Sequence, residues 1–153
     1  LTPAAVNPEG RFPNCALRCT TEWTIPEADS PEVQPLGLTA SERLALIGID
    51  GHINGGTWEE PGIRLLGQPY NLNGPTLLQC DLEARGVQDV QWDQVTVEQE
   101  RDAARRWQLL LQLNGGQEVP YNWGGSGVLH VCIERAALAA RDFSRTWVNI
   151  QCV

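Results

Sequence analysis

Few side chains in this sequence are equipped for catalysis. The chain of 153 residues has two histidines, His52 and His130, and five cysteines, at positions 15, 19, 80, 132 and 152. His130 and Cys132 would share one face of a strand, where side chains two residues apart stand roughly 7 Å from each other, beyond the reach of a thiol and its base. The common hydrolase, metalloprotease and phosphate-binding motifs are missing from the sequence. The sequence therefore favours a non-catalytic protein.

The candidate metal ligands are the two imidazoles, His52 and His130, with Asp50 or Glu59 adding oxygen. Two imidazoles rarely make a tight copper site. The cysteines form no CxxC pair and no Cys/His cluster, which argues against zinc, and the acidic residues lack the spacing of a calcium loop. We expect no cofactor, and copper is the alternative.

The cysteine content points to a compartment in which disulfides form. Five cysteines in a chain of this length exceed what a reducing cytosol usually contains without a metal site. The sequence begins at Leu1 with neither a charged leader nor an apolar run, and we interpret it as a mature chain whose signal peptide has been removed. No stretch has the 18 or more consecutive apolar residues of a membrane span. We expect an extracytoplasmic protein, secreted or held at the cell surface or envelope.

The charge balance excludes one class of partner. All 11 basic side chains are Arg, 19 side chains are acidic, and the formal charge is −8. An acidic surface without a basic cluster does not attract polyanions. Nucleic acid is therefore excluded as a partner, and so is an anionic membrane surface.

Tryptophans are the best candidates for binding. Trp58 and Trp123 fall in Gly-rich loops, the second near Tyr121, and Trp23 lies among the N-terminal prolines. Trp147 is out of phase with Val148 and the apolar residues after it, so we expect it to face outward. Exposed aromatic rings anchor protein partners or stack on sugars. The predicted binding residues are Trp23, Trp58, Tyr121, Trp123 and Trp147.

The elements that must position these residues are predominantly strands. Six of the ten prolines lie in residues 1–35, which predicts an extended arm that docks on the domain or on a partner. Residues 36–153 form the predicted domain. Apolar runs and period-two alternation predict strands at 43–50, 62–67, 76–84, 87–97 with a break, 107–114, 128–134 and 146–152. Only 98–106 has helical character, and 136–140 could form a helical turn. The prediction is an all-β antiparallel sandwich of seven or eight strands.

The order and spacing of Cys80, Trp92 and Cys132 resemble those of an immunoglobulin-like domain, with His130 at the place of its corner tyrosine. The resemblance covers residues 76–152. It implies a disulfide between Cys80 and Cys132 packed on Trp92. In that case Cys152 pairs with Cys15 or Cys19, and one thiol is left over.

A second resemblance concerns the end of the chain. Cys152 is placed like the second cysteine of the structural disulfide in copper superoxide dismutases, which are Greek-key sandwiches, but the His-x-His pair of that family is missing. We expect an accessory or structural subunit of a bacterial cell-envelope assembly, such as a surface layer, pilus or outer-membrane complex, that acts through protein contacts. The alternatives are a copper-dependent superoxide dismutase-like protein of the envelope and a carbohydrate-binding module built on Trp58, Tyr121 and Trp123.

Overall fold

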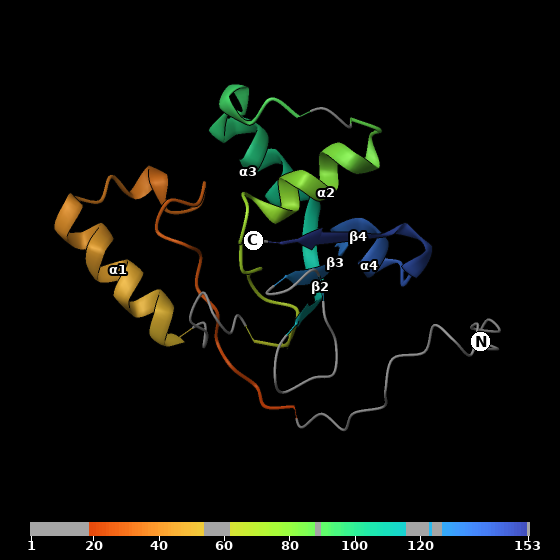
Figure 1. Ribbon diagram of the computed structural model, residues 1–153, viewed down its shortest axis with the longest axis horizontal. Helices are drawn as coiled ribbons and strands as arrows, with labels where there is room; N and C mark the ends of the chain where they lie inside the picture. Colours follow the sequence, from red (N-terminus) through yellow and green to blue (C-terminus); the bar gives the residue numbers. More distant parts are fainter. Residues whose placement is uncertain (1–18, 54–61, 88–89, 116–122, 124–126, 153) are drawn as a thin grey trace.

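The fold combines helices with one antiparallel sheet (Figure 1). The computed structural model describes residues 19–53, 62–87, 90–115, 123 and 127–152. The helices are α1 (Ala40–Ile53), α2 (Thr76–Ala84), α3 (Val97–Arg106) and α4 (Arg135–Ala139), with short 3₁₀ turns η2 (Gln34–Leu36), η3 (Trp92–Gln94) and η4 (Phe143–Arg145). The strands are β1 (Arg64–Leu65), β2 (Trp107–Asn114), β3 (Val128–Glu134) and β4 (Thr146–Gln151). The predicted all-β sandwich is therefore wrong, and the protein is a mixed α/β structure.

The sheet is a four-stranded meander in the order β1-β2-β3-β4, with every neighbouring pair antiparallel. Helix α2 lies across one face, where Leu77 and Cys80 pack against Trp107 and Cys132. We call this the inner face and the opposite one the outer face. A second cluster, formed by Leu78, Leu82 and Ala103, joins α2 to α3. The core thus lies between the inner face and the two helices.

Five elements agree with the sequence. The predicted strands at 107–114, 128–134 and 146–152 are β2, β3 and β4, and the predicted strand at 62–67 shrinks to the two residues of β1. The predicted helix at 98–106 is α3, which Thr96 and Gln99 open with a reciprocal capping box. These confirmed segments are the ones in which local pattern and tertiary packing agree.

Two predicted strands are helices instead. Residues 76–84 form α2, because Leu78 and Leu82 lie one turn apart and pack together on α3, and because no β-branched residue follows Thr76 in this segment. Residues 43–50 fall in α1, whose start is marked by Thr39 and Glu42: the Glu42 carboxylate accepts from the Thr39 amide at 2.8 Å. Residues 87–97 contain no strand where the structure describes them.

The described end of the N-terminal arm docks on the domain. Ala28, Pro31 and Val33 are buried, and the Gln68 amide donates to Thr24 Oγ1 at 3.0 Å. Helix α1, in contrast, stands apart from the sheet and has no buried residue (Figure 1). Within the described ranges, no helix has the length and apolar character that crossing a membrane requires.

Candidate functional site

Four polar side chains form a straight row across the inner face. The strand register places Arg64 opposite Gln112, Gln112 opposite His130, and His130 opposite Asn149. Gln112 and His130 are fully buried, and Asn149 is 5% exposed. A sheet face under a helix is usually apolar, so these groups need polar partners to offset their desolvation.

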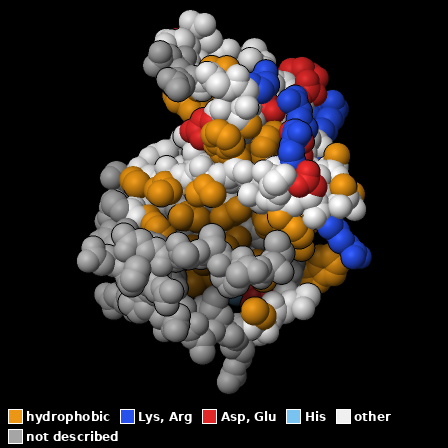
Figure 2. All heavy atoms as spheres, turned by 90° about the vertical axis from the view of Figure 1, so that its right-hand side faces the viewer, with side chains coloured by type: hydrophobic (Ala, Val, Ile, Leu, Met, Phe, Trp, Pro, Cys, Tyr) orange, Lys and Arg blue, Asp and Glu red, His pale blue; other side chains and the backbone are white. Residues whose placement is uncertain are grey.

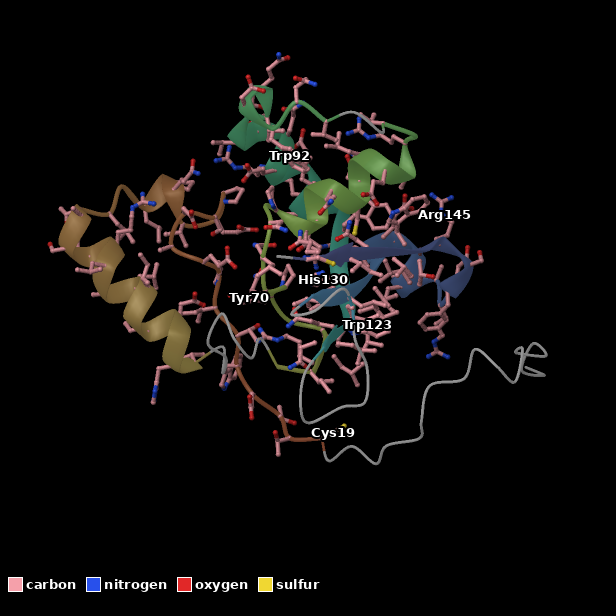
Figure 3. The ribbon with its side chains drawn as sticks, viewed as in Figure 1. Cys19, Tyr70, Trp92, Trp123, His130 and Arg145 are labelled. Atoms are coloured by element: carbon pink, nitrogen blue, oxygen red, sulfur yellow. The ribbon has the colours of Figure 1, made fainter. Side chains whose placement is uncertain are left out.

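Most of these partners come from the irregular segment 68–74 that precedes α2. Gln112 Oε1 accepts from the Tyr70 amide at 2.8 Å, and His130 Nε2 donates to the Tyr70 carbonyl at 3.0 Å. Gln151, also on the inner face, accepts from the amides of Leu72 at 2.7 Å and Asn73 at 3.1 Å. Figure 3 shows Tyr70 and His130 side by side below α2. The polar row therefore fixes a backbone segment that no strand pairs with.

His130 is held as a neutral imidazole. Its pKa is lowered to about 4, chiefly because burial disfavours the charged ring. The hydrogen bond to the Tyr70 carbonyl acts in the opposite direction, and the nearby Arg64 adds a smaller lowering effect. Since Nε2 carries the proton, Nδ1 is an acceptor. It has no hydrogen-bond partner among the described residues, and neither has Asn149 Oδ1. Two acceptors cannot satisfy one another. Because the His130 ring is fully buried and is bonded to the Tyr70 carbonyl, it does not reach solvent.

Acidic side chains of α2 complete this buried network. Asp81 is a hub: its Oδ1 accepts from Trp107 Nε1 at 3.0 Å and from Arg106 at 2.8 Å, and its Oδ2 pairs with Arg85 at 2.7 Å. Glu83 accepts from Trp147 Nε1 at 2.8 Å. These contacts link α2 to Trp107 of β2 and to Trp147 of β4.

The outer face has the opposite character, because it is apolar and partly exposed. The register aligns two rows across the strands, and their members are Leu65, Leu111, Val131 and Val148 in the first and Leu113, Leu129 and Ile150 in the second. Leu65, Val148 and Ile150 are 65%, 54% and 47% exposed. In the view of Figure 2, hydrophobic side chains gather across the middle of the molecule, and Arg and acidic groups lie mostly at its upper right. Neither row contains a charged side chain, which makes the outer face a candidate protein interface.

The comparisons with known proteins give a family. The model of a domain of unknown function, DUF1963, matches residues 55–152, which is more than half of the chain. The chain belongs to the DUF1963 family. No curated protein and no solved structure matches the sequence. The sheet, α2, α3 and α4 all fall within the DUF1963 domain, whereas α1 and the docked arm precede it.

The three predicted binding tryptophans that the structure describes, Trp23, Trp123 and Trp147, lie in different surroundings. Trp23 is 88% exposed, ahead of the docked part of the arm. Trp147 was expected to face outward, and this is wrong: its ring packs against the cluster of Cys80, Trp107 and Cys132. Trp123 is partly buried, and its carbonyl accepts from Cys152 Sγ at 3.2 Å. Trp58 and Tyr121 lie outside the described residues.

The cysteines follow the predicted placement of Cys80 beside Cys132, but not the predicted disulfide. Cys80 and Cys132 lie side by side in the core, but as free thiols, and Cys19 and Cys152 are free as well. Trp92, which the immunoglobulin resemblance placed on that pair, is 43% exposed in η3, and Trp107 takes its place. Cys15 lies outside the described residues.

The two histidines are on different parts of the molecule. His52 is exposed in the last turn of α1, and His130 is buried in the sheet. Within the described ranges, no three His, Cys, Asp or Glu side chains gather as metal ligands would. The sequence analysis missed Gln112, Asn149 and Gln151. Their alternate positions in the predicted strands are a signal for a shared face, but polar residues in such a pattern are usually on the exposed face.

Proposed function

We propose that this DUF1963 protein is a non-catalytic structural subunit that acts through protein contacts, and that its outer sheet face makes the contact. The observation that carries the proposal is the pair of uncharged apolar rows, with Leu65, Val148 and Ile150 about half exposed or more. The buried state of His130, Cys80 and Cys132 supports a non-catalytic role, since none of these groups reaches solvent.

We propose that the outer face binds the outer face of a second copy of this chain. An uncharged surface favours an uncharged partner surface. The outer face of a second copy is such a surface, and its shape matches because two sheet faces pack with their strands nearly aligned. A two-fold axis through the face would place each apolar row against a row of the other copy. The charge of −8 per chain stays outside the contact.

The expected association is weak. Burying the exposed parts of three aliphatic side chains contributes about 2–5 kcal/mol per copy, and thus about 4–10 kcal/mol for two copies. The loss of translational and rotational freedom costs about 4–15 kcal/mol. These two quantities nearly cancel, so the dimer should form only at high local concentration, as in an assembly. A place in the cell envelope, which the cysteine content favours, stays a prediction that cell fractionation tests.

Sedimentation velocity from about 10 µM to 1 mM tests the contact. We expect the native chain to show a concentration-dependent dimer and Val148→Arg to raise its dissociation constant at least tenfold. The matched control is Leu44→Arg on α1, a site that is 70% exposed and lies outside the sheet. A native chain that stays monomeric at 1 mM contradicts the proposal, and so does a dimer that only Leu44→Arg dissociates.

A further inference from the structure

A small cavity lies where the docked arm meets the DUF1963 domain. Its volume is about 50 Å³. The lining residues come from the arm (Glu27, Ser30, Pro31 and Glu32), from the segment before α2 (Gln68, Pro69, Asn71 and Pro75), from the start of α2 (Thr76, Leu77 and Leu78) and from α3 (Glu100 and Ala104). Three walls from distant parts of the sequence meet there, and one of them lies outside the family match. The cavity is separate from the outer face that carries the proposed function.

Carboxylates give the cavity its charge. Glu27, Glu32 and Glu100 line it, and no Arg of the described residues forms an ion pair with any of them, since Arg101 and Arg105 of α3 pair with Glu98 and Asp102. Burial raises the pKa of Glu27 and of Glu100, and neighbouring acidic groups, Asp29 among them, raise both further. The cavity is therefore an unneutralised negative site.

Two hydroxyl groups at the cavity lack partners. Thr76 is fully buried, and neither its Oγ1 nor Ser30 Oγ has a hydrogen-bond partner among the described residues. A buried hydroxyl without a partner is costly, so it marks a place where a ligand can be bound. Glu27 is already oriented, because Asn71 donates to both of its oxygens, at 3.2 Å from the amide and 3.0 Å from Nδ2.

We propose that this cavity binds a primary ammonium group, through the Glu27 carboxylate and the hydroxyl oxygens of Ser30 and Thr76. An ammonium group has three N–H donors and no acceptor, which matches three oxygen acceptors. Leu77, Leu78 and the ring of Pro31 supply apolar walls for an alkyl stem. A divalent metal is a poorer fit, since the described carboxylates do not gather as a metal-ligand group.

The side chains of this protein cannot provide the ligand, because the sequence contains no Lys. The two sources that we consider are a small free amine and a lysine side chain of a protein partner. The chemistry is the same in both cases, so the experiment needs a probe for each source. n-Butylammonium represents the free amine, and Nα-acetyl-lysine methylamide represents the protein side chain.

Titration of the full chain at pH 7 and low salt, followed by amide NMR shifts, tests the proposal. We expect saturable shifts at Asn71 and Thr76 with both probes, and the tighter probe identifies the source. Glu27→Gln should weaken binding at least tenfold, and Thr76→Val and Ser30→Ala at least threefold each. The control, Glu98→Gln on the exposed side of α3, should change the affinity less than twofold.

Three results would overturn the proposal. The first is a linear, non-saturating response to both probes. The second is binding that survives Thr76→Val and Ser30→Ala, two variants that keep the Glu27 and Asn71 contacts of the fold. The third is equal affinity for Nα-acetyl-arginine methylamide, since a planar guanidinium does not match the three-donor geometry. None of these results depends on dimer formation through the outer face.

Discussion

The thiols of Cys80 and Cys132 lie against each other in the core, one from α2 and one from β3, and neither side chain is exposed to solvent. Hydrogen bonding to Cys132 and burial raise the pKa of the Cys80 thiol. A thiolate is the form that reacts with disulfide reagents. Cys80 is therefore protected both by burial and by its raised pKa, and Cys132 is protected by burial.

The first prediction concerns thiol labelling. We expect an aromatic disulfide reagent to modify exposed Cys19 within minutes in the native protein and to leave Cys80 and Cys132 unmodified until denaturant is added. Mass spectrometry of labelled peptides assigns each site, and Cys19→Ser should remove the fast reaction. If Cys80 and Cys132 stay unlabelled in denaturant without reductant, they form the disulfide that the immunoglobulin resemblance implied.

The immunoglobulin resemblance correctly placed Cys80 next to Cys132, although the all-β sandwich that it implied is wrong. Cys80 and Cys132 are both at apolar positions of alternating segments, and such residues meet in a core whether the first segment is a strand or a helix. Periodicity over nine residues did not separate the two for 76–84, because Leu78, Cys80 and Leu82 fit a strand face and Leu78 with Leu82 also fits a helix face. The capping residues Thr39 and Glu42 were a better signal for α1 than the apolar run that follows them.

The faces of β4 show why the site was harder to predict than the strand. The strand itself is confirmed, but Val148 and Ile150 are exposed while Asn149 and Gln151 are buried. An apolar residue is assigned to the core by default, and only the segment 68–74, which lies nearly 80 residues earlier in the sequence, makes the polar face the buried one. In β2 a bulge at Leu110 shifts the alternation, so that Leu111 and Leu113 point to the outer face.

The second prediction concerns Asp81, whose side chain is 4% exposed and pairs with both Arg85 and Arg106. Asp81→Asn leaves two guanidinium groups without their common carboxylate, and we expect the free energy of unfolding to fall by about 2–4 kcal/mol. The matched control is Asp102→Asn, which breaks an exposed pair with Arg105 and should cost less than about 0.5 kcal/mol. Urea unfolding measures both. An equal loss of unfolding free energy in both variants would mean that the Asp81 ion pairs stabilise the fold no more than an exposed pair does.

The third prediction concerns Gln151, which makes four hydrogen bonds, two to the amides of Leu72 and Asn73 and two from its Nε2 to Gly74 O and Gln79 Oε1. Gln151→Ala should cost about 2–4 kcal/mol. It should also speed hydrogen exchange at the Leu72 and Asn73 amides more than at the Leu109 amide of β2, because the segment is released before the sheet opens. Exposed Gln91→Ala is the control. Uniform acceleration would show that Gln151 stabilises the whole domain and not this segment.

The last prediction is a pH dependence that His130 causes. Its pKa falls from 6.5 to about 4 on folding, so the unfolded chain binds more protons than the native chain between these values. Stability is therefore complete above about pH 6.5 and decreases as the pH falls toward 4, with a total loss of about 3 kcal/mol from this residue.

His130→Gln keeps a donor for the Tyr70 carbonyl but cannot take up a proton. We expect it to flatten the stability profile between pH 4 and 6.5 relative to the native chain, whereas His52→Gln, at an exposed site on α1, should leave the slope unchanged. The difference between the profiles isolates His130 from Glu27, whose raised pKa acts with the opposite sign in the acid range. Parallel profiles for the native chain and His130→Gln would show that His130 is not held neutral by the inner face.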